Sequence, residues 1–111
     1  MIYNKLVRDK IPEIIAKSGK KAKVRIVQGE ELKRALKNKL VEEANELLRA
    51  NTKEAEIEEL ADVCEVLLAI LYENGISTNK IAAAWVEKNS RKGRLEKGYF
   101  LESVEELSDE A

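Results

Sequence analysis

The sequence predicts an all-α fold, an antiparallel helix bundle with short irregular N- and C-terminal segments. Two stretches of about twenty residues, 30–50 and 52–73, repeat their leucines, isoleucines and valines at helical spacing. The chain has only one proline and five glycines to interrupt helices. One stretch, 23–29, alternates as a strand does, but it is too short and isolated to form a sheet. With 111 residues, we expect a single domain over 1–111.

The first helix is expected over residues 10–18. Asp9 can cap its N-terminus, and Pro12 is tolerated in the first turn because no intrahelical donor is needed there. Ser18 and the glycine after it are typical of a helix end.

Two long helices follow, over Glu30–Ala50 and 52–73. Asn51, with Glu54 three residues later, resembles a capping box for the second of them. Asn74 and the next glycine close it. Because the connection is so short, we expect the two helices to pack antiparallel.

A fourth helix is expected to begin at Ser77 or Thr78 and to end near Lys92. After Gly93 the pattern becomes irregular, with an extended stretch at 98–101 and a weak acidic helix beyond it.

Composition excludes several classes of function. The chain has no histidine, so no mechanism can use an imidazole. Its single cysteine, Cys64, cannot form an internal disulfide, which favours a reducing, cytoplasmic setting. The N-terminal sequence MIYNKLVRDK does not resemble a signal peptide. The longest apolar run, 66–72, is too short to span a membrane.

Charge is distributed unevenly along the chain. Residues 1–40 carry twelve basic and four acidic side chains, whereas residues 41–75 carry two basic and ten acidic ones. Residues 76–98 are basic again, and the remainder is acidic. An acidic centre between basic segments suits a metal ion that meets a polyanion, but a nucleic-acid surface or simple solubility stays open.

Helical angles separate the acids of the two long helices into two kinds. Glu43 falls in the middle of the leucine stripe of the first, Glu46 at its edge and Glu42 further round. In the second, Glu59 and Asp62 share a face with Ala55, Val66 and Ile70. A different face carries Ile57, Leu60, Cys64, Leu67 and Leu71. Acids such as Glu58 and Glu65 point elsewhere and are interpreted as solvated.

Four carboxylates, those of Glu43, Glu46, Glu59 and Asp62, are therefore expected on facing helix surfaces. Buried carboxylates need a cation, and ligand sets made only of oxygen suit Mg²⁺, with Mn²⁺ as a second candidate. The alternative is that basic side chains neutralise these acids, or that the helices are rotated away from this register.

The pattern Glu42-Glu43-x-x-Glu46, then twelve residues, then Glu59-x-x-Asp62 resembles the EExxE…ExxD signature of the all-α nucleoside triphosphate pyrophosphohydrolases. This group includes MazG proteins, phosphoribosyl-ATP pyrophosphohydrolases, dUTPases and dCTPases. Two further stretches, YNKLVRDKIPEII and EKNSRKGRLEKGYFLE, resemble the phosphoribosyl-ATP pyrophosphohydrolase-like branch. The resemblance covers nearly the whole chain.

The resemblance implies a role for each matching position. Glu43, Glu46, Glu59 and Asp62 match the family's metal ligands, and Glu42 matches an acid whose role is open between supporting the ligands and activating water. The implied substrate-binding residues are Lys5, Arg8, Lys10, Asn89, Arg91, Lys92 and Lys97, each with plain surface exposure as its alternative. Arg94 departs from the branch, which often has a glycine there. Trp85 and Tyr99 could stack on a nucleotide base. For Trp85, a position in the core is the stronger alternative.

The function that follows is Mg²⁺-dependent hydrolysis of a nucleotide to a nucleoside monophosphate and pyrophosphate, in the housecleaning of non-standard nucleotides. Phosphoribosyl-ATP hydrolysis in histidine biosynthesis is an alternative. A non-enzymatic helical nucleic-acid-binding module is an alternative of another class, disfavoured by the acidic centre. The resemblance and the surplus apolar helix surface also predict a homodimer or a dimer of dimers, with no membrane association.

Overall fold

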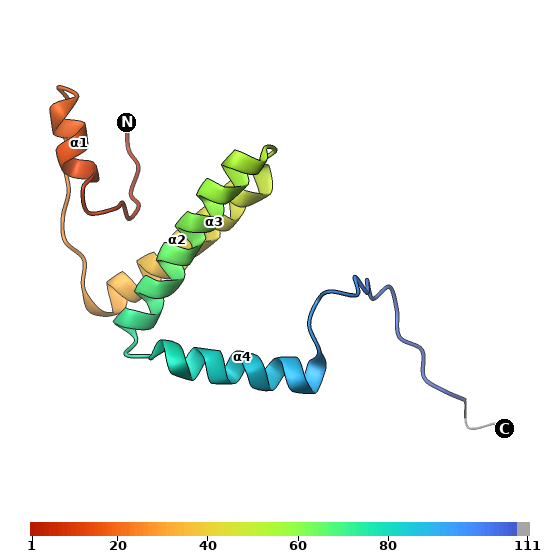
Figure 1. Cartoon of the computed structure of the whole chain (residues 1–111). Coiled ribbons are helices and arrows are strands. Elements are labelled where there is room, and N and C mark those ends of the chain that lie inside the picture. Colours follow the sequence, from red (N-terminus) through yellow and green to blue (C-terminus); the bar gives the residue numbers. More distant parts are fainter. Residues whose placement is uncertain (109–111) are drawn as a thin grey trace. The chain divides into compact units, whose positions relative to one another are not determined.

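The computed structural model of the chain describes residues 1–108, which contain four helices and no strand. They are α1 (Ile11–Lys17), α2 (Gly29–Arg49), α3 (Lys53–Glu73) and α4 (Thr78–Lys92), as Figure 1 shows. The predicted all-α class is confirmed. Each helix lies within two residues of its predicted bounds. Among these helices, none has both the length and the apolar character that crossing a membrane requires.

The chain divides into two compact units, Met1–Ser77 and the part that begins at Thr78. The first unit holds α1, α2 and α3 and therefore all the acids of the predicted site. The second holds α4 and the later basic segment. A single domain over 1–111 stays a prediction.

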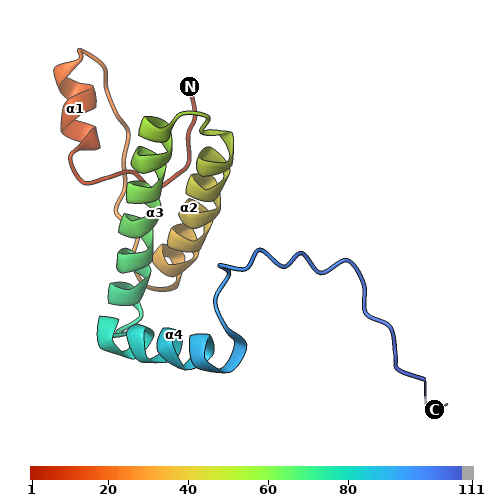
Figure 2. The same cartoon turned by 45° about the vertical axis from the view of Figure 1, so that its right-hand side comes forward.

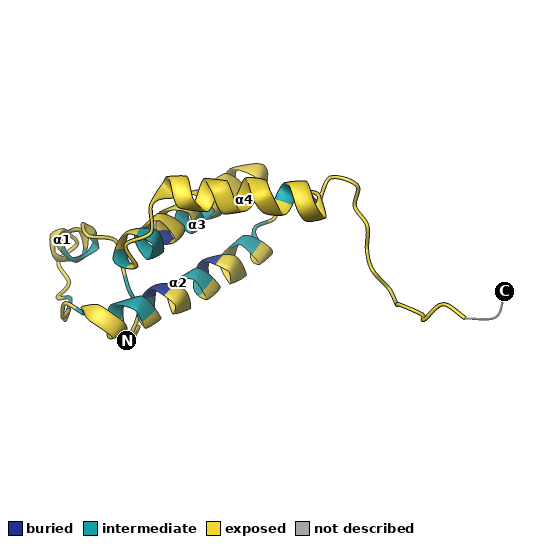
Figure 3. Cartoon of the chain, turned by 90° about the horizontal axis from the view of Figure 1, so that it is seen from below, coloured by how far each residue is buried: buried dark blue, intermediate teal, exposed yellow. Residues whose placement is uncertain are grey.

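Helices α2 and α3 form an antiparallel pair that is the centre of the first unit. They lie side by side in the two views of Figures 1 and 2, joined by a turn over 50–52. Leu36 of α2 and Val66 of α3 are its buried apolar side chains, with exposed fractions of 7% and 6%. Within residues 1–108 the buried positions occur only on these two helices (Figure 3).

The face of α3 that carries the acids is the one that packs. Val66, which shares that face with Glu59, is buried, whereas Ile57 and Leu67 of the other apolar face are 58% and 45% exposed. Cys64, in the middle of that second face, is exposed as well. The acids therefore lie at the contact between the helices, and a row of apolar side chains points away from it.

Specific capping residues begin and end α3. The side chain of Thr52 caps the N-terminus by accepting a hydrogen bond from the backbone N–H of Ala55 at 3.1 Å. The prediction of Asn51 as the cap was wrong by one residue, because the turn places the hydroxyl of Thr52 over the first free N–H groups. At the other end, Asn74 is the C-cap as predicted, and Gly75 takes a φ of 64° that suits glycine.

Helix α1 begins one residue later than predicted. Its N-cap is Lys10, with φ −90° and ψ −5° and no side-chain hydrogen bond. Asp9 as the cap was therefore wrong, because Lys10 rather than Asp9 stands between the irregular segment and the first helical turn. Pro12 lies in that first turn, where its missing N–H is harmless.

The predicted weak helix beyond residue 101 is absent from 102–108, and residues 109–111 lie outside the described part. Glu102, Glu105 and Glu106 would stand three and four residues apart on such a helix, where like charges repel. The stretches 23–29 and 98–101 are irregular rather than strands. Neither has a partner strand within residues 1–108 to supply backbone hydrogen bonds.

Candidate functional site

The site is built on the middle of α2 and the first half of α3. Glu43 projects from the leucine stripe of α2 and is only 7% exposed, which makes it the buried charged side chain of residues 1–108. Glu59 and Asp62 are partly buried on the packed face of α3. Because the two helices are antiparallel neighbours, these three side chains approach one another from both sides of the helix contact.

The three carboxylates form a compact group of oxygen donors. One oxygen from each of Glu43, Glu59 and Asp62 lies within 4.8 Å of the others. Glu46, the fourth predicted acid, lies outside this group, and its carboxylate accepts a hydrogen bond from Arg49 at 3.1 Å. The structure thus brings together three of the four predicted acids.

Burial and crowding of negative charge both act on the pKa of Glu59. Loss of water around the carboxylate, a hydrogen bond with Glu43 and the charges of Glu43, Asp62 and Glu46 all raise the pKa of Glu59 above its ordinary value. Two carboxylates at hydrogen-bonding distance share a proton or bind a cation. This pair therefore has the property expected of a cation site.

Three basic side chains approach these acids or the neighbouring Glu42. The guanidinium of Arg8 donates to Asp62 at 2.8 Å, and the ammonium of Lys5 donates to Glu42 at 3.1 Å. Burial alone would raise the pKa of Glu42, but the hydrogen bonds from Lys5 and Lys39 outweigh it and lower that pKa. Part of the acidic charge is thus neutralised within the chain, as the alternative interpretation of the sequence required.

Lys39 is the site residue that sequence reasoning missed. Its ammonium lies 3.2 Å from Glu42 and 3.3 Å from Glu43, and its side chain is only 17% exposed. The signal was present in the sequence, because Lys39 precedes these acids by three and four residues on one helix. A lysine at this spacing turns toward the same face as the buried glutamate.

The donor set fits a hard divalent cation. One oxygen from each acid lies within 4.8 Å of the others, close to the separation of roughly 3 to 4.2 Å between oxygens that would bind one Mg²⁺. Glu43, Glu59 and Asp62 offer only oxygen, and no histidine exists in the chain. Carboxylates favour Mg²⁺ or Mn²⁺ over the softer metals that thiolate or imidazole ligands select.

The predicted substrate-binding residues lie in both units. In the second unit, Asn89, Lys92 and Lys97 are among eight residues, between Asn89 and Tyr99, that line an open pocket of about 530 Å³. Arg91 is not among them, and its guanidinium pairs with Glu87 at 2.9 Å. In the first unit, Lys10 is exposed at the start of α1.

The two aromatic candidates of the second unit are both open to solvent. Trp85 is 62% exposed, so it is no core residue of its unit. Tyr99 is 87% exposed, and the ammonium of Lys97 stands 6.0 Å from its ring centre.

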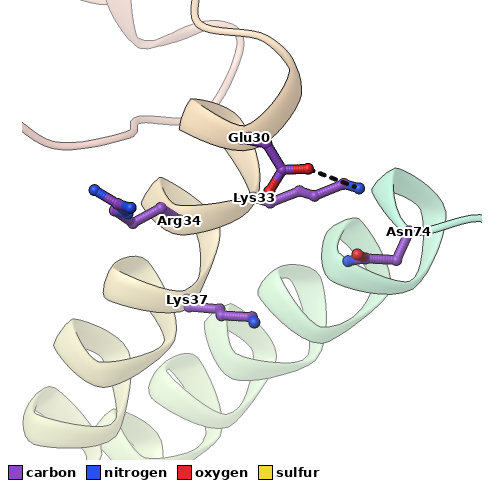
Figure 4. Close-up of a pocket in the computed structure, with 5 residues that line it drawn as sticks. All are labelled: Glu30, Lys33, Arg34, Lys37 and Asn74. Carbon is purple, nitrogen blue, oxygen red and sulfur yellow. Dashed lines mark ion pairs between the residues drawn. The ribbon is translucent and has the colours of Figure 1, made fainter.

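A second open pocket, of about 370 Å³, lies between the start of α2 and the end of α3 (Figure 4). Its lining is mostly basic, from Lys33, Arg34 and Lys37, together with Asn74, the C-cap of α3, and with Glu30 paired to Lys33 at 3.5 Å. None of the residues predicted for the site lines it, so it is a separate feature of the helix pair.

Comparison with known proteins identifies the family. The sequence model described as phosphoribosyl-ATP pyrophosphohydrolase matches residues 8–89, which is most of the chain. The chain belongs to this family. The phosphoribosyl-ATP pyrophosphohydrolase family is part of the all-α NTP pyrophosphohydrolase superfamily, whose members hydrolyse phosphoric anhydrides. The matched range contains Arg8, Lys39 and the three clustered acids, but it excludes Lys5 and the basic residues after 89.

Part of the chain is similar to a curated protein. Over 53 residues the chain is 45% identical to an uncharacterized protein of Mycolicibacterium smegmatis, and the matched stretch covers 48% of this chain and 54% of that protein. The chain thus spans about half the length of the curated relative it matches. No solved structure matches this chain significantly.

Proposed function

We propose that this chain is a Mg²⁺-dependent nucleoside triphosphate pyrophosphohydrolase, which cleaves a nucleotide to a nucleoside monophosphate and pyrophosphate. The observation that carries the proposal is the group of three carboxylates, with donor oxygens within 4.8 Å of one another, at the contact of two antiparallel helices. Membership of a pyrophosphohydrolase family gives this oxygen-donor site a reaction.

Glu43, Glu59 and Asp62 are the proposed metal ligands, and Glu46 joins them if it exchanges Arg49 for the ion. A Mg²⁺ ion held there supplies neutralisation of phosphate charge and orientation of the attacking water. Lys39 holds Glu43 in position from within the same helix. It also reduces the repulsion that assembling these acids creates.

Glu42 has a different proposed role from the ligands. Lys5 and Lys39 keep it ionised, and it lies next to Glu43 in the sequence but outside the three-acid group. A carboxylate that stays ionised and is not bound to the metal can accept a hydrogen bond from water and so orient it. The lysines that lower the pKa of Glu42 also make it a weaker base, so we assign to Glu42 the orientation of the attacking water.

Substrate contacts are proposed for the basic side chains. Arg8, Lys5 and Lys10 supply positive charge in the first unit, and Asn89, Arg91, Lys92 and Lys97 form the polar and basic set of the second. Cationic donors of this kind stabilise the charge that develops on a leaving pyrophosphate. The open pocket between Asn89 and Tyr99 supports a binding role for three of them, Asn89, Lys92 and Lys97.

Two substrate classes fit the proposed reaction. Housecleaning of damaged or modified nucleoside triphosphates is the first, because the acid group by itself recognises a metal-bound polyphosphate and no particular base. Phosphoribosyl-ATP is the second, and the description of the matching family favours it. Phosphoribosyl-ATP carries a phosphoribosyl group that the nucleoside triphosphates of the first class lack, so a substrate panel separates the two classes.

The deciding experiment follows pyrophosphate release with Mg²⁺ from a panel of standard and damaged nucleoside triphosphates and from phosphoribosyl-ATP. We expect turnover of at least one of them. The variant Glu43→Gln/Glu59→Gln should lose at least about 100-fold in rate, since loss of groups that merely support metal ligands already costs 10–100-fold. Glu58→Gln is the matched control, because Glu58 is an exposed acid of the same helix. No release from any substrate by metal-loaded protein would contradict the proposal.

We also propose that the chain forms a homodimer or a dimer of dimers. The second apolar face of α3, which carries Ile57, Leu60, Cys64 and Leu67, is uncovered within the first unit. A row of exposed apolar side chains on one helix is typical of an interface. A second copy of the same face would cover it with matching apolar surface.

A further inference from the structure

Arg8 differs from the other basic side chains of the site in where it comes from. It lies in the irregular segment before α1, and its partner Asp62 is 54 positions later in the sequence. The ion pair is short, at 2.8 Å, but Arg8 is 56% and Asp62 37% exposed at the side chain. A pair this exposed is held weakly and is open to competing ions.

Lys39 is the opposite case. It belongs to the same helix as its partners Glu42 and Glu43, and its side chain is 17% exposed. The helix itself therefore keeps Lys39 beside the acids. Its helix thus fixes Lys39 beside the three-acid group, whereas Arg8 is held there by its ion pair with Asp62.

The carboxylate that Arg8 occupies is one of the three that form the donor group. A divalent cation bound to that group would stand within a few ångströms of the guanidinium, and like charges at such distances repel strongly. The positive charge of Arg8 and the ion therefore compete for Asp62. A charged side chain on an irregular segment is displaced more readily than a metal ligand on a helix.

We propose that Arg8 is the exchangeable counter-ion of the metal site. It neutralises Asp62 while the site holds no metal, leaves that carboxylate when a divalent cation binds, and then pairs with phosphate oxygens of the nucleotide. This inference rests on the proposed function, because it requires the metal site.

The N-terminal segment is attached in a way that suits such an exchange. Lys5, three residues before Arg8, pairs with Glu42 at 3.1 Å, and Glu42 lies outside the three-acid group. A cation bound by Glu43, Glu59 and Asp62 leaves that second contact in place. The released guanidinium therefore stays near the site, where a planar fork of donors fits phosphate oxygens.

The first test measures binding of Mn²⁺ and Mg²⁺ by calorimetry, without nucleotide, to the unaltered chain and two variants. Arg8→Gln removes the competitor, and we expect it to bind metal about tenfold more tightly, given the loss of one positive charge a few ångströms away. Lys5→Gln is the matched control. It removes a positive charge whose partner is not in the donor group, so we expect it to tighten metal binding by about twofold or less.

The outcomes separate the two proposals. If the unaltered chain binds no metal, both the proposed site and the role of Arg8 are wrong. If the chain binds metal and Arg8→Gln binds it equally or more weakly, the site stands and the exchange is wrong. Equal tightening by Arg8→Gln and Lys5→Gln would also overturn the exchange, because the effect would then be that of overall charge.

A second readout follows the guanidinium directly. In an NMR spectrum of chain labelled at arginine, the Nε–H signal of Arg8, assigned by its absence in Arg8→Gln, should shift on addition of Mg²⁺. It should shift again when a nucleotide is added. A merely structural Arg8 predicts no shift with Mg²⁺.

In turnover assays the exchange predicts that Arg8→Gln raises KM for the nucleotide while it tightens binding of the metal. Loss of structure cannot produce this combination.

Discussion

Glu42 and Glu59 show how neighbouring carboxylates of one site acquire opposite properties. Hydrogen bonds from Lys5 and Lys39 lower the pKa of Glu42, whereas burial and the nearby acids, Glu43 above all, raise the pKa of Glu59. The difference arises from which face of the helix pair each side chain occupies. A single acidic stretch of sequence thus contains both a stabilised charge and a destabilised one.

These opposite shifts predict opposite effects of pH in metal-free protein. The pKa of Glu59 is raised above 4.5, so the folded state binds more protons than the unfolded one between those two pKa values. Stability is therefore lost as pH rises through that window. The pKa of Glu42 is lowered below 4.5, so its contribution is present above 4.5 and is lost as pH falls through its folded value.

The measurement is thermal unfolding of Glu59→Gln and Glu42→Gln with a chelator present, from pH 7 down to the lowest pH at which the chain is folded. At pH 7, Glu59→Gln should unfold at a higher temperature than the unaltered chain, and Glu42→Gln at a lower one. Both differences should shrink as pH falls below the ordinary carboxyl range. Shifts in the same direction for both variants would show that charge neighbours do not decide their effects.

The positions of the acids could be predicted from the sequence, but their partners could not. Helical angles are fixed by the backbone repeat, so the sequence alone was enough to place Glu43, Glu59 and Asp62 toward the same contact. The pairing of Glu46 with Arg49 depends on side-chain rotamers. The pairing of Arg8 with Asp62 depends on the path of an irregular segment, which no periodicity describes. The roles of these residues in catalysis stay predictions.

At the scale of the elements, periodicity and turn residues were sufficient for the four helices. The predictions that were wrong concern single caps and a weakly patterned terminal stretch. Asn51 and Thr52 are adjacent residues of similar capping ability, so the sequence alone could not choose between them. The path of the turn decides which of them reaches the free N–H groups.

The cap of α3 provides a direct test of that choice. Thr52→Ala removes the acceptor for the N–H of Ala55 and should lower the free energy of unfolding by about 1 kcal/mol. Asn51→Ala, one residue earlier, should change it by less than about 0.5 kcal/mol, as for an ordinary exposed position. Denaturant unfolding of both variants measures the two values. A larger effect at Asn51 would mean that the capping residue is the predicted one.

The exposed apolar face of α3 predicts the state of association. Leu67→Glu places a charge on that face, and we expect it to convert the oligomer to monomers, since a buried unpaired charge is strongly unfavourable. Glu65→Gln, at an exposed acid outside that face, is the control and should leave the mass unchanged. Size-exclusion chromatography with light scattering gives the masses. A monomer in the unaltered chain would contradict the proposed oligomer.

At the scale of the whole molecule, metal binding and stability are linked. A cation that binds the folded site and not the unfolded chain stabilises the protein by about 2.7 kcal/mol at 100 times its dissociation constant. For a chain of this size that corresponds to an increase of about 10 °C in Tm. Addition of Mg²⁺ should produce this increase and a chelator should remove it.

Glu43→Gln/Glu59→Gln is the control for that linkage, because it lacks two of the three clustered carboxylates. Its Tm should not respond to Mg²⁺. Without the metal, the same variant should unfold at a temperature equal to or above that of the unaltered chain, since repulsion between the acids is removed. Unfolding of this variant at a much lower temperature would show instead that the acids belong to a structural network of ion pairs.

The short separation of the site residues along the chain affects how the protein folds. Glu43, Glu59 and Asp62 come from one pair of helices joined by a three-residue turn, so bringing them together requires closing only a small loop. Contacts so local in sequence form early and fast. The three acids are therefore brought together as soon as α2 and α3 have paired, whether or not α4 has formed. A divalent ion present at that moment can act on the folding reaction itself.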